Sequence, residues 1–308
     1  MTVPDDRWLG LWPDTEAPLD VVEWDLEGAP PASLAGRRPG LVVLPYLDSA
    51  RAVRNLHSID GLQVVQTLTA GYDDVRAHLP EGVTLCNAAG VHDASTAELV
   101  VGLTIAALRG IGEFARAQTT GTWIAGYRPA LADKRVLVVG AGSVGGAIVD
   151  RFAPFEVSLT RVATTARDDA RGHVHGIDEL PGLLPRHDVV VLVVPLSDTT
   201  RGLVDAAFLA ALPDGALLVN VARGPVVDTA ALLAEVTTGR IVAALDVTDP
   251  EPLPADHPLW RAPGVLISPH VGGDTTAFPP RARRLLKAQL GRWAAGEPLA
   301  NVVAGPPR

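Results

Sequence analysis

The 308-residue chain is poor in several kinds of residue that would point to particular functions. It has one cysteine, Cys86, so neither a disulfide framework nor a cysteine-based zinc site can form within one chain. Acidic residues outnumber basic ones by 35 to 26, and the net charge of −9 argues against binding to the nucleic-acid phosphate backbone. No apolar stretch reaches about 18 uninterrupted residues, so no membrane span is expected.

The N-terminal stretch MTVPDDRWLG lacks the basic segment and the following apolar run that a secretory signal peptide requires. Hydrophobic residues make up 47% of the chain and charged residues 20%, which is the composition of an ordinary globular protein. We therefore expect a soluble cytoplasmic protein. The length favours two domains over one.

Short β-branched runs alternate with helical patterns along most of the chain. Strands are predicted at 41–47, 62–68, 135–142, 157–163, 188–195, 215–222, 241–247 and 264–270. Helices are predicted at 97–110, 144–154, 205–215 and 229–239, with an amphipathic helix at 280–298. Several strand runs are apolar at every position, which is typical of parallel strands covered on both faces. The alternation predicts a doubly wound α/β fold.

The stretch RVLVVGAGSVGGAIVDRF reads as a strand, a tight turn and a helix, and it contains the pattern G-x-G-x-x-G. Gly140 would form the turn, Gly142 would let a pyrophosphate approach the backbone, and Gly145 would let helix and strand pack closely. Ser143 and Val144 would begin the helix, whose free N–H groups bind phosphate. This context favours a dinucleotide site. The alternative is a tight strand-to-helix connection without a ligand.

The identity of the dinucleotide depends on the residues after the next strand. An acidic residue about 20 positions beyond the glycine motif would bind the ribose 2′-OH of NAD. Ala163 stands at the corresponding position, and Thr164, Thr165 and Arg167 follow it. Hydroxyl groups and an arginine can hold a 2′-phosphate. The sequence therefore favours NADP over NAD.

Neighbouring charges leave two alternatives open. Asp168 and Asp169 follow so closely that a small shift of the loop could bring a carboxylate to the ribose and favour NAD. Arg161 and Arg167 could also be solvated surface residues without a ligand, which is the commoner fate of an arginine.

Beyond the glycine motif, the sequence resembles the D-isomer-specific 2-hydroxyacid dehydrogenases over most of its length. Three blocks are similar to the signature segments of this family and stand in the same order: VNVARGPVVDTAALL at 219–233, ALDVTDPEPLPADHPLW at 244–260 and SPHVGG at 268–273. GVHDASTAELVVGLTIAALR at 90–109 resembles the interdomain helix of the family, and TAGYDDV at 69–75 resembles its substrate loop.

The resemblance implies two α/β domains, Rossmann-like and flavodoxin-like, with a cleft between them. Residues 1–90 and 279–308 would together form a discontinuous substrate domain, and 91–278 would form the dinucleotide-binding Rossmann domain. The segment 112–129 resembles the dimer arm of the family, so a homodimer is expected.

The resemblance also implies hydride transfer between NAD(P)H and a small 2-keto acid or D-2-hydroxy acid, in the manner of a glyoxylate/hydroxypyruvate reductase or a broader enzyme. Arg223 matches the residue that binds the substrate carboxylate and polarises its carbonyl. His270 matches the general acid/base, and Glu251 matches the acid paired with it. Histidine titrates near neutral pH, a neighbouring carboxylate favours the imidazolium, and an arginine stabilises charge on the carbonyl oxygen.

Other positions match the cofactor and substrate contacts of the family, which include no metal ligand. Asp246 matches the residue that holds the nicotinamide carboxamide, although it could instead only cap the turn that follows it. The remaining cofactor matches are Thr96 at the phosphates, Pro195 and Leu196 over the adenosine half, and Val221 and Ala222 beside the nicotinamide. The remaining substrate matches are Tyr46 and Leu47, which would line the pocket, and the backbone of Ala70 and Gly71, which would bind the carboxylate.

Two other protein classes share parts of this pattern. NAD(P)-sensing corepressors of the same fold can keep the catalytic residues, so this alternative stays open, although their partner-binding tails are not evident here. Short-chain dehydrogenases share the glycine motif but need the pattern Tyr-x-x-x-Lys. Tyr46, Tyr72 and Tyr127 all lack a lysine at that spacing, which excludes this class.

Overall fold

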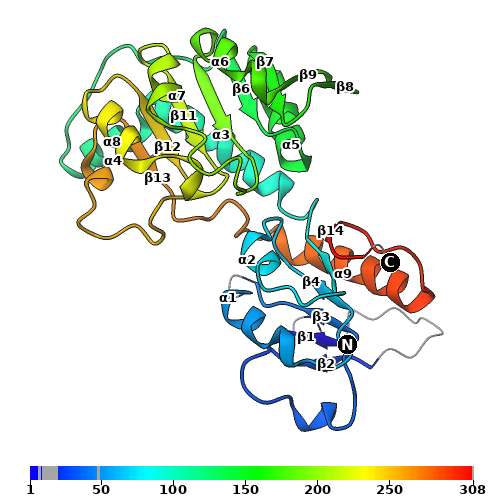
Figure 1. Cartoon of the computed structure of the whole chain (residues 1–308). Helices are drawn as coiled ribbons and strands as arrows, with labels where there is room; N and C mark the ends of the chain where they lie inside the picture. Colours follow the sequence, from blue (N-terminus) through cyan, green and yellow to red (C-terminus); the bar gives the residue numbers. More distant parts are fainter. Residues whose placement is uncertain (6–7, 9–19, 47–48, 307–308) are drawn as a thin grey trace. The chain divides into compact units, whose positions relative to one another are not determined.

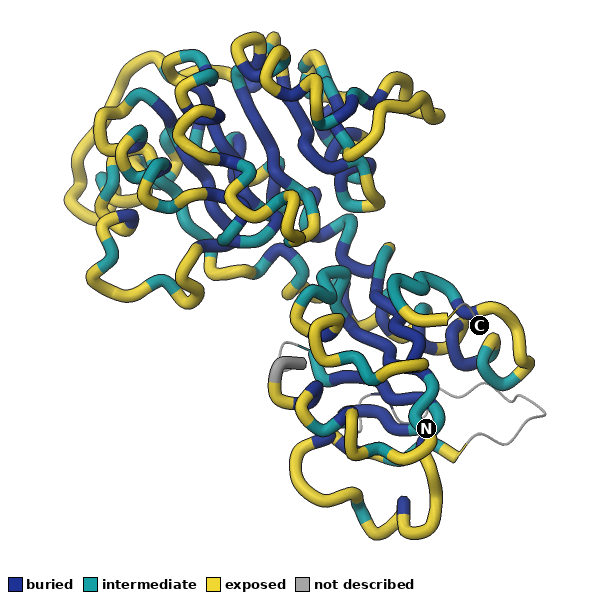
Figure 2. Tube along the Cα trace, viewed as in Figure 1, coloured by how far each residue is buried: buried dark blue, intermediate teal, exposed yellow. Residues whose placement is uncertain are grey.

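A computed structural model describes residues 1–5, 8, 20–46 and 49–306 of the chain. The chain forms two compact units. Unit 1 combines Met1–His92 with Thr276–Arg308, and unit 2 is the continuous segment Asp93–Thr275 (Figure 1). In both units the buried residues follow the strands, while the connecting loops are mostly exposed (Figure 2).

Unit 1 contains a sheet in the order β14-β5-β4-β3-β1-β2. Its strands are β1 (Thr2–Val3), β2 (Val22–Glu23), β3 (Leu41–Val43), β4 (Val64–Gln66), β5 (Thr84–Cys86) and β14 (Val302–Ala304). Its α-helices are α1 (Ser49–Ala52), α2 (Asp73–Arg76) and α9 (Phe278–Ala295). The strands pair in parallel except β14, which runs antiparallel to β5 at one edge.

The sheet of unit 1 is buried on both faces. Along β3, Leu41 and Val43 pack into one apolar cluster and Val42 into the other, because successive side chains of a strand point to opposite faces. Helix α9 covers the first face with a stripe of residues four apart, Phe278, Ala282, Leu286 and Leu290. Cys86 lies in this core, and burial raises the pKa of its thiol to about 11, so it acts as an apolar side chain.

Unit 2 contains a sheet in the order β13-β12-β11-β10-β6-β7-β9-β8. Its strands are β6 (Arg135–Val139), β7 (Ser158–Ala163), β8 (Arg167–Asp169), β9 (Gly172–Gly176), β10 (Val189–Leu192), β11 (Leu217–Asn220), β12 (Val242–Leu245) and β13 (Val265–Ile267). Its α-helices are α3 (Asp93–Arg109), α4 (Ile111–Thr119), α5 (Ser143–Phe152), α6 (Leu180–Leu183), α7 (Ala206–Ala211) and α8 (Thr229–Thr237). Helices α3 and α5 contribute to the core on one face, and α7 and α8 to the core on the other.

The α/β fold class predicted from the sequence is confirmed, with two mostly parallel sheets. Each sheet also has an antiparallel pair at its edge, β14 with β5 and β8 with β9, which the sequence analysis did not predict. The helix predicted at 205–215 ends at Ala211, because Leu212 precedes Pro213 and takes an extended conformation.

Within the described residues, no single helix is long and apolar enough to cross a membrane. Helices α3 and α4, which meet at a bend of 66°, would reach that length and apolarity only together.

Candidate active site

The sequence-predicted site residues of unit 2 gather at the carboxyl ends of its parallel strands. The final residues of β6, β10, β11, β12 and β13 pair across the sheet, which brings the loops that follow them to one edge. The glycine motif follows β6, Ala163 ends β7, Pro195 and Leu196 follow β10, Val221 to Arg223 follow β11, Asp246 and Glu251 follow β12, and His270 follows β13. In open α/β sheets, ligands bind at this edge where the strand order reverses, which here is between β6 and β10.

The glycine motif has the local geometry of a phosphate-binding turn. Gly140 has a φ of +121°, and a Cβ there would lie 2.5 Å from the carbonyl oxygen of Val193. A Cβ on Gly145 would collide with the carbonyl oxygen of Gly140. At Gly142, by contrast, no atom of the described residues lies within 4 Å of such a Cβ. Since α5 begins at Ser143, this open space faces a helix N-terminus, so the turn fits a pyrophosphate.

The residues at the end of β7 are open to solvent beside this turn. Ala163 is half-buried, and Thr164, Thr165 and Arg167 are exposed. The Arg167 guanidinium donates hydrogen bonds to the carbonyl oxygens of Ala141 (3.2 Å) and Thr165 (3.4 Å). These bonds place its positive charge next to the glycine motif.

The other charged residues of this region are engaged elsewhere. Arg161 is buried and donates to both carboxylate oxygens of Asp169 at 2.8 Å, and to the carbonyl oxygen of Gly172 at 2.7 Å. The hydrogen bonds from Arg161 lower the pKa of Asp169 to about 2. Asp168 contacts His173 Nδ1 at 2.9 Å. Arg161 is therefore a structural residue: from β7 it engages Asp169, while Asp168 is engaged by His173 of β9.

The loop after β11 is shaped by Asn220 and Gly224. The buried Asn220 side chain accepts a hydrogen bond from the Ala222 N–H (3.0 Å) and donates one to the Arg223 carbonyl oxygen (3.1 Å). A Cβ on Gly224 would collide with the carbonyl oxygen of Thr248, so only glycine lets the two loops approach this closely. This contact joins the Arg223 loop to the loop that carries Glu251.

Glu251 and His270 form a pair, as the sequence analysis hypothesised. His270 Nδ1 lies 2.5 Å from Glu251 Oε1, and the two side chains are 42% and 39% exposed, respectively. The other carboxylate oxygen of Glu251 accepts a hydrogen bond from the Thr248 N–H at 3.3 Å. His270 has a φ of +53°, a strained conformation for a residue with a side chain, and such strain is concentrated at functional sites.

Charges at this pair favour the ionised form of both groups. The hydrogen bond to Glu251 raises the pKa of His270, although burial and the positive charge of Arg223 oppose the rise. Burial acts to raise the pKa of Glu251, but the hydrogen bond and charge of His270, with a contribution from Arg223, lower it overall. The His270 imidazolium can give a proton to a bound acid, and its neutral form can take the proton back. The positive charges of His270 and Arg223 attract the negative charge of that acid.

The structure shows that Asp246 holds a turn on another loop, which is neither of the two roles considered from the sequence. Its buried carboxylate accepts hydrogen bonds from Ser268 Oγ (2.6 Å), from the Val271 N–H (3.0 Å) and from the Gly272 N–H (2.9 Å). Its backbone oxygen accepts the His270 N–H at 2.7 Å. Asp246 therefore holds the turn in which His270 stands.

Sequence reasoning missed Asn220, Thr248 and Ser268 as residues that position this site. A usable signal was present for Asn220, because it is a polar residue at the end of the apolar run LLVN. The contributions of Thr248 and Ser268 depend on loop conformations that the sequence pattern does not reveal.

The remaining predicted residues occupy varied environments. Thr96 lies in the first turn of α3, close to Gly272: a Cβ added to Gly272 would lie 3.5 Å from the Thr96 side chain. The Pro195 carbonyl oxygen accepts a hydrogen bond from Thr200 Oγ1 at 2.6 Å. Leu196 and Val221 are half-buried, and Ala222 is buried.

In unit 1, Tyr46 follows β3, and its ring stacks on Phe278 with centroids 4.0 Å apart. Ala70 and Gly71 lie in the loop after β4, where Asn87 Nδ2 donates to the Ala70 carbonyl oxygen at 2.7 Å and Thr69 Oγ1 donates to that of Gly71 at 2.7 Å. Leu47 lies outside the described residues.

Comparisons with known proteins agree on one family. Residues 101–272 match the family described as D-isomer specific 2-hydroxyacid dehydrogenase, NAD binding domain. The chain is 33% identical to a glyoxylate reductase of Thermofilum pendens over 240 residues, which cover 74% of this chain and 71% of that protein.

Solved structures of similar fold carry either nicotinamide cofactor. A D-isomer specific 2-hydroxyacid dehydrogenase from Xanthobacter autotrophicus, in complex with NADPH and MES, is 34% identical with a TM-score of 0.75, covering 87% of this chain and 84% of that one. A formate dehydrogenase from Staphylococcus aureus in complex with NAD is 25% identical with a TM-score of 0.72, covering 87% and 83%. The match to the family over more than half of the chain, together with these relatives, shows that the protein belongs to the NAD(P)-dependent D-isomer specific 2-hydroxyacid dehydrogenases.

Proposed function

We propose that the protein is a reversible reductase of small 2-keto acids, such as glyoxylate or hydroxypyruvate, and that it prefers NADPH. Arg223, Glu251 and His270 are its catalytic residues. The observation that carries this proposal is the 2.5 Å contact between His270 Nδ1 and Glu251 Oε1, in a place where the charge of Arg223 acts on both groups. The activity of the Thermofilum pendens relative, glyoxylate reduction, is of the same kind.

His270 is the proton donor in the direction of reduction. Because Glu251 engages Nδ1, the opposite ring nitrogen, Nε2, is left to donate a proton to the substrate carbonyl oxygen. Glu251 also raises the pKa of His270, which favours the protonated imidazole. In the direction of oxidation, the neutral imidazole takes the proton back from the hydroxyl group.

Arg223 binds the substrate and stabilises its developing charge. Its guanidinium can take a carboxylate through two parallel hydrogen bonds, and it stabilises negative charge on the carbonyl oxygen. A hydrogen bond of 2.8 Å from Arg223 to the Ala222 carbonyl oxygen helps to orient it. The resemblance to the family assigns the backbone of Ala70 and Gly71 to the substrate carboxylate, and Tyr46 and Leu47 to the substrate side chain.

The preference for NADPH rests on the residues after β7. Thr164, Thr165 and Arg167 are exposed beside the glycine motif and can bind a 2′-phosphate. The carboxylates of Asp168 and Asp169, by contrast, are engaged by His173 and Arg161, respectively. The bound cofactor supplies the hydride. Its phosphates would be held by the N–H groups of Ser143, Val144 and Gly145 and by Thr96. Its other contacts would be Pro195 and Leu196 at the adenosine half, and Val221, Ala222 and Asp246 at the nicotinamide.

We further propose that the protein is a homodimer. The segment 112–129 presents apolar side chains to solvent, among them Trp123, which is 94% exposed, and Tyr127, which is fully exposed. Large apolar side chains this exposed commonly mark an interface with another protein chain. The resemblance of this segment to the dimer arm of the family supports a second copy as that chain.

The substitution His270→Gln tests the catalytic assignment. We expect kcat for reduction of glyoxylate or hydroxypyruvate by NADPH to fall by about 100-fold or more, because the general acid is lost. The affinity for NADPH, measured by fluorescence titration, should stay within about twofold. His57→Gln, which removes an exposed histidine from unit 1, is the matched control and should change neither quantity.

An equal loss of NADPH affinity in His270→Gln would overturn the acid/base role. If the unmodified protein binds NADPH but reduces no member of a broad 2-keto acid panel, we would conclude that it is a corepressor-like nucleotide sensor and not a reductase.

A further inference from the structure

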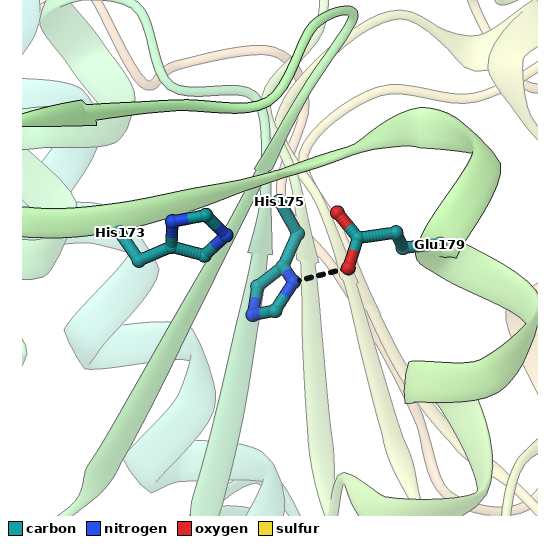
Figure 3. Close-up of side chains that lie close together, drawn as sticks. All are labelled: His173, His175 and Glu179. Atoms are coloured by element: carbon teal, nitrogen blue, oxygen red, sulfur yellow. Dashed lines mark hydrogen bonds and ion pairs between the residues drawn. The ribbon is translucent and has the colours of Figure 1, made fainter.

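A cluster of potential metal ligands lies in unit 2 on the β8–β9 hairpin and the short helix that follows it. His173 and His175 are two positions apart on β9, so their side chains leave the same face of the strand. Glu179 ends the 3₁₀ helix Ile177–Glu179. Figure 3 shows the His175 ring between His173 and Glu179, and one ligand atom from each residue lies within 4.8 Å of the others.

Hydrogen bonds already orient these side chains. His173 Nδ1 contacts Asp168 Oδ1 at 2.9 Å, which leaves Nε2 of His173 as its metal-binding atom. A carboxylate on one ring nitrogen is the usual partner of a histidine whose other nitrogen binds a metal. Glu179 Oε1 accepts the Gly176 N–H at 2.9 Å, so backbone contact fixes the carboxylate while Oε2 faces His175 Nδ1 at 2.8 Å.

We propose that His173, His175 and Glu179 bind a divalent transition-metal ion, with Zn²⁺ as the representative of the class. Two imidazole nitrogens and one carboxylate oxygen are ligands that Zn²⁺, Co²⁺ and Ni²⁺ accept, whereas Mg²⁺ and Ca²⁺ prefer oxygen ligands alone. The ion takes the place of the proton between His175 Nδ1 and Glu179 Oε2. Water completes the coordination shell.

The distances allow this with small movements. Metal–ligand bonds of about 2.0–2.1 Å in a tetrahedron place neighbouring ligand atoms about 3.3 Å apart. The distance between His175 Nδ1 and Glu179 Oε2 must therefore increase by about half an ångström. Ligand atoms that lie as far as 4.8 Å apart must approach one another by up to about 1.5 Å. The side chains of His173, His175 and Glu179 are 52%, 28% and 42% exposed, so neighbouring atoms leave room for such rotations.

The ion would act as a structural link. His173 pairs with Asp168 across the hairpin, and Glu179 belongs to the helix after β9. Coordination would therefore join both strands of the hairpin to the segment that follows them.

The test uses the full chain without a polyhistidine tag, freed of metal with a chelator that is then removed. We expect isothermal titration with Zn²⁺ to give saturable binding of one equivalent. His173→Ala and His175→Ala should each weaken binding by at least about tenfold. Glu179→Gln should weaken it too, while its amide oxygen can still accept the Gly176 N–H. His78→Ala, which removes an exposed histidine from unit 1, is the matched control and should bind Zn²⁺ like the parent chain.

A second readout separates this site from loss of folding. Added Co²⁺ should produce visible absorption bands in the parent chain that disappear in His173→Ala, whose circular dichroism should match that of the parent because the side chain is largely exposed. If His175→Ala does not fold, His173→Ala and Glu179→Gln carry the test. Absence of saturable Zn²⁺ binding, or equal Zn²⁺ binding by parent and His173→Ala, would overturn the proposal.

Discussion

At the scale of single residues, the pair of Glu251 and His270 depends on a neighbour that the sequence analysis assigned elsewhere. Asp246 holds the turn around His270 through its carboxylate and its backbone oxygen, and His270 keeps a φ of +53° within that turn. A strained residue persists only where surrounding contacts fix it. The orientation of the imidazole is therefore set by both carboxylates, Glu251 at the ring and Asp246 at the backbone.

Glu251→Gln should shift the pH dependence of reduction. Reduction needs protonated His270, so kcat/KM should be constant at low pH and fall as the pH rises through the pKa of His270. The hydrogen bond to Glu251 raises that pKa from its ordinary value. Without the carboxylate, burial and Arg223 both favour the neutral ring, so the fall should move to lower pH. The measurement is kcat/KM with NADPH over about pH 5–10. Glu297→Gln, which removes an exposed carboxylate from unit 1, should leave the profile unchanged. An unshifted profile in Glu251→Gln would refute the pairing.

Arg167→Ala should weaken NADPH binding by about tenfold, equivalent to about 1.4 kcal/mol, because a charge-assisted hydrogen bond to the 2′-phosphate is lost. NADH affinity should hardly change, since NADH has no phosphate at that position. Dissociation constants for both cofactors can be measured by fluorescence titration. Arg186→Ala, at another exposed arginine of unit 2, is the control. Equal weakening of both cofactors, or of neither, would contradict the assignment of the 2′-phosphate.

At the scale of elements, the site depends on loops that pack directly against one another. The loop after β11 meets the loop after β12 where Gly224 lies against the Thr248 carbonyl, and the buried Arg161 fixes the hairpin to β7 by bonds to Asp169 and Gly172. The short apolar strands of unit 2 define the edge of the sheet from which the loops of the site emerge. Backbone contacts and ion pairs then set the positions of these loops.

Gly224→Ala should lower both stability and activity. The added methyl group forces the Thr248 backbone away, at a cost of about 2 kcal/mol in the free energy of unfolding, and it displaces Arg223 relative to Glu251. Urea unfolding and kcat measure the two effects. Gly182→Ala in α6 is the control, because no atom of the described residues lies within 4 Å of its Cβ position; it should be neutral or slightly stabilising. A Gly224→Ala variant as stable and active as the parent would refute the tight contact.

The sequence predicted those elements whose side chains follow a simple pattern. Runs such as VVVL and LLVN have four buried positions in succession and were predicted as strands. The hairpin of β8 (RDD) and β9 (GHVHG) was missed, because most of its residues are polar and exposed. Its pairing depends on Arg161, which lies on another strand. The role of Asp246 was also not predictable from a local pattern, because its contacts with residues 268–272 exist only once the backbone of that distant turn has formed.

At the scale of the whole molecule, the described apolar clusters each stay within one unit. Two clusters lie on the two faces of the sheet of unit 2, and two others on the faces of the sheet of unit 1. Each unit therefore has a core of its own, and the chain passes between the units at 92–93 and at 275–276.

The proposed homodimer predicts that substitutions in the segment 112–129 change the oligomeric state. Trp123→Ser combined with Tyr127→Ser should convert a dimer into a monomer in sedimentation velocity, because these exposed side chains are proposed to be buried against the second copy. Trp260→Ser changes another exposed tryptophan of unit 2 and should leave the dimer intact. A parent chain that sediments as a monomer would exclude this assembly.

The continuity of Asp93–Thr275 makes this protein suited to the construction of chimaeras. All the proposed catalytic side chains lie in that one uninterrupted segment, so a single gene fragment would transfer them to another member of the family. Unit 1 is made of two separate pieces of chain, and a transplant of its loops would have to replace both ends of the gene together. Crossovers at the junctions 92–93 and 275–276 would divide no described apolar cluster.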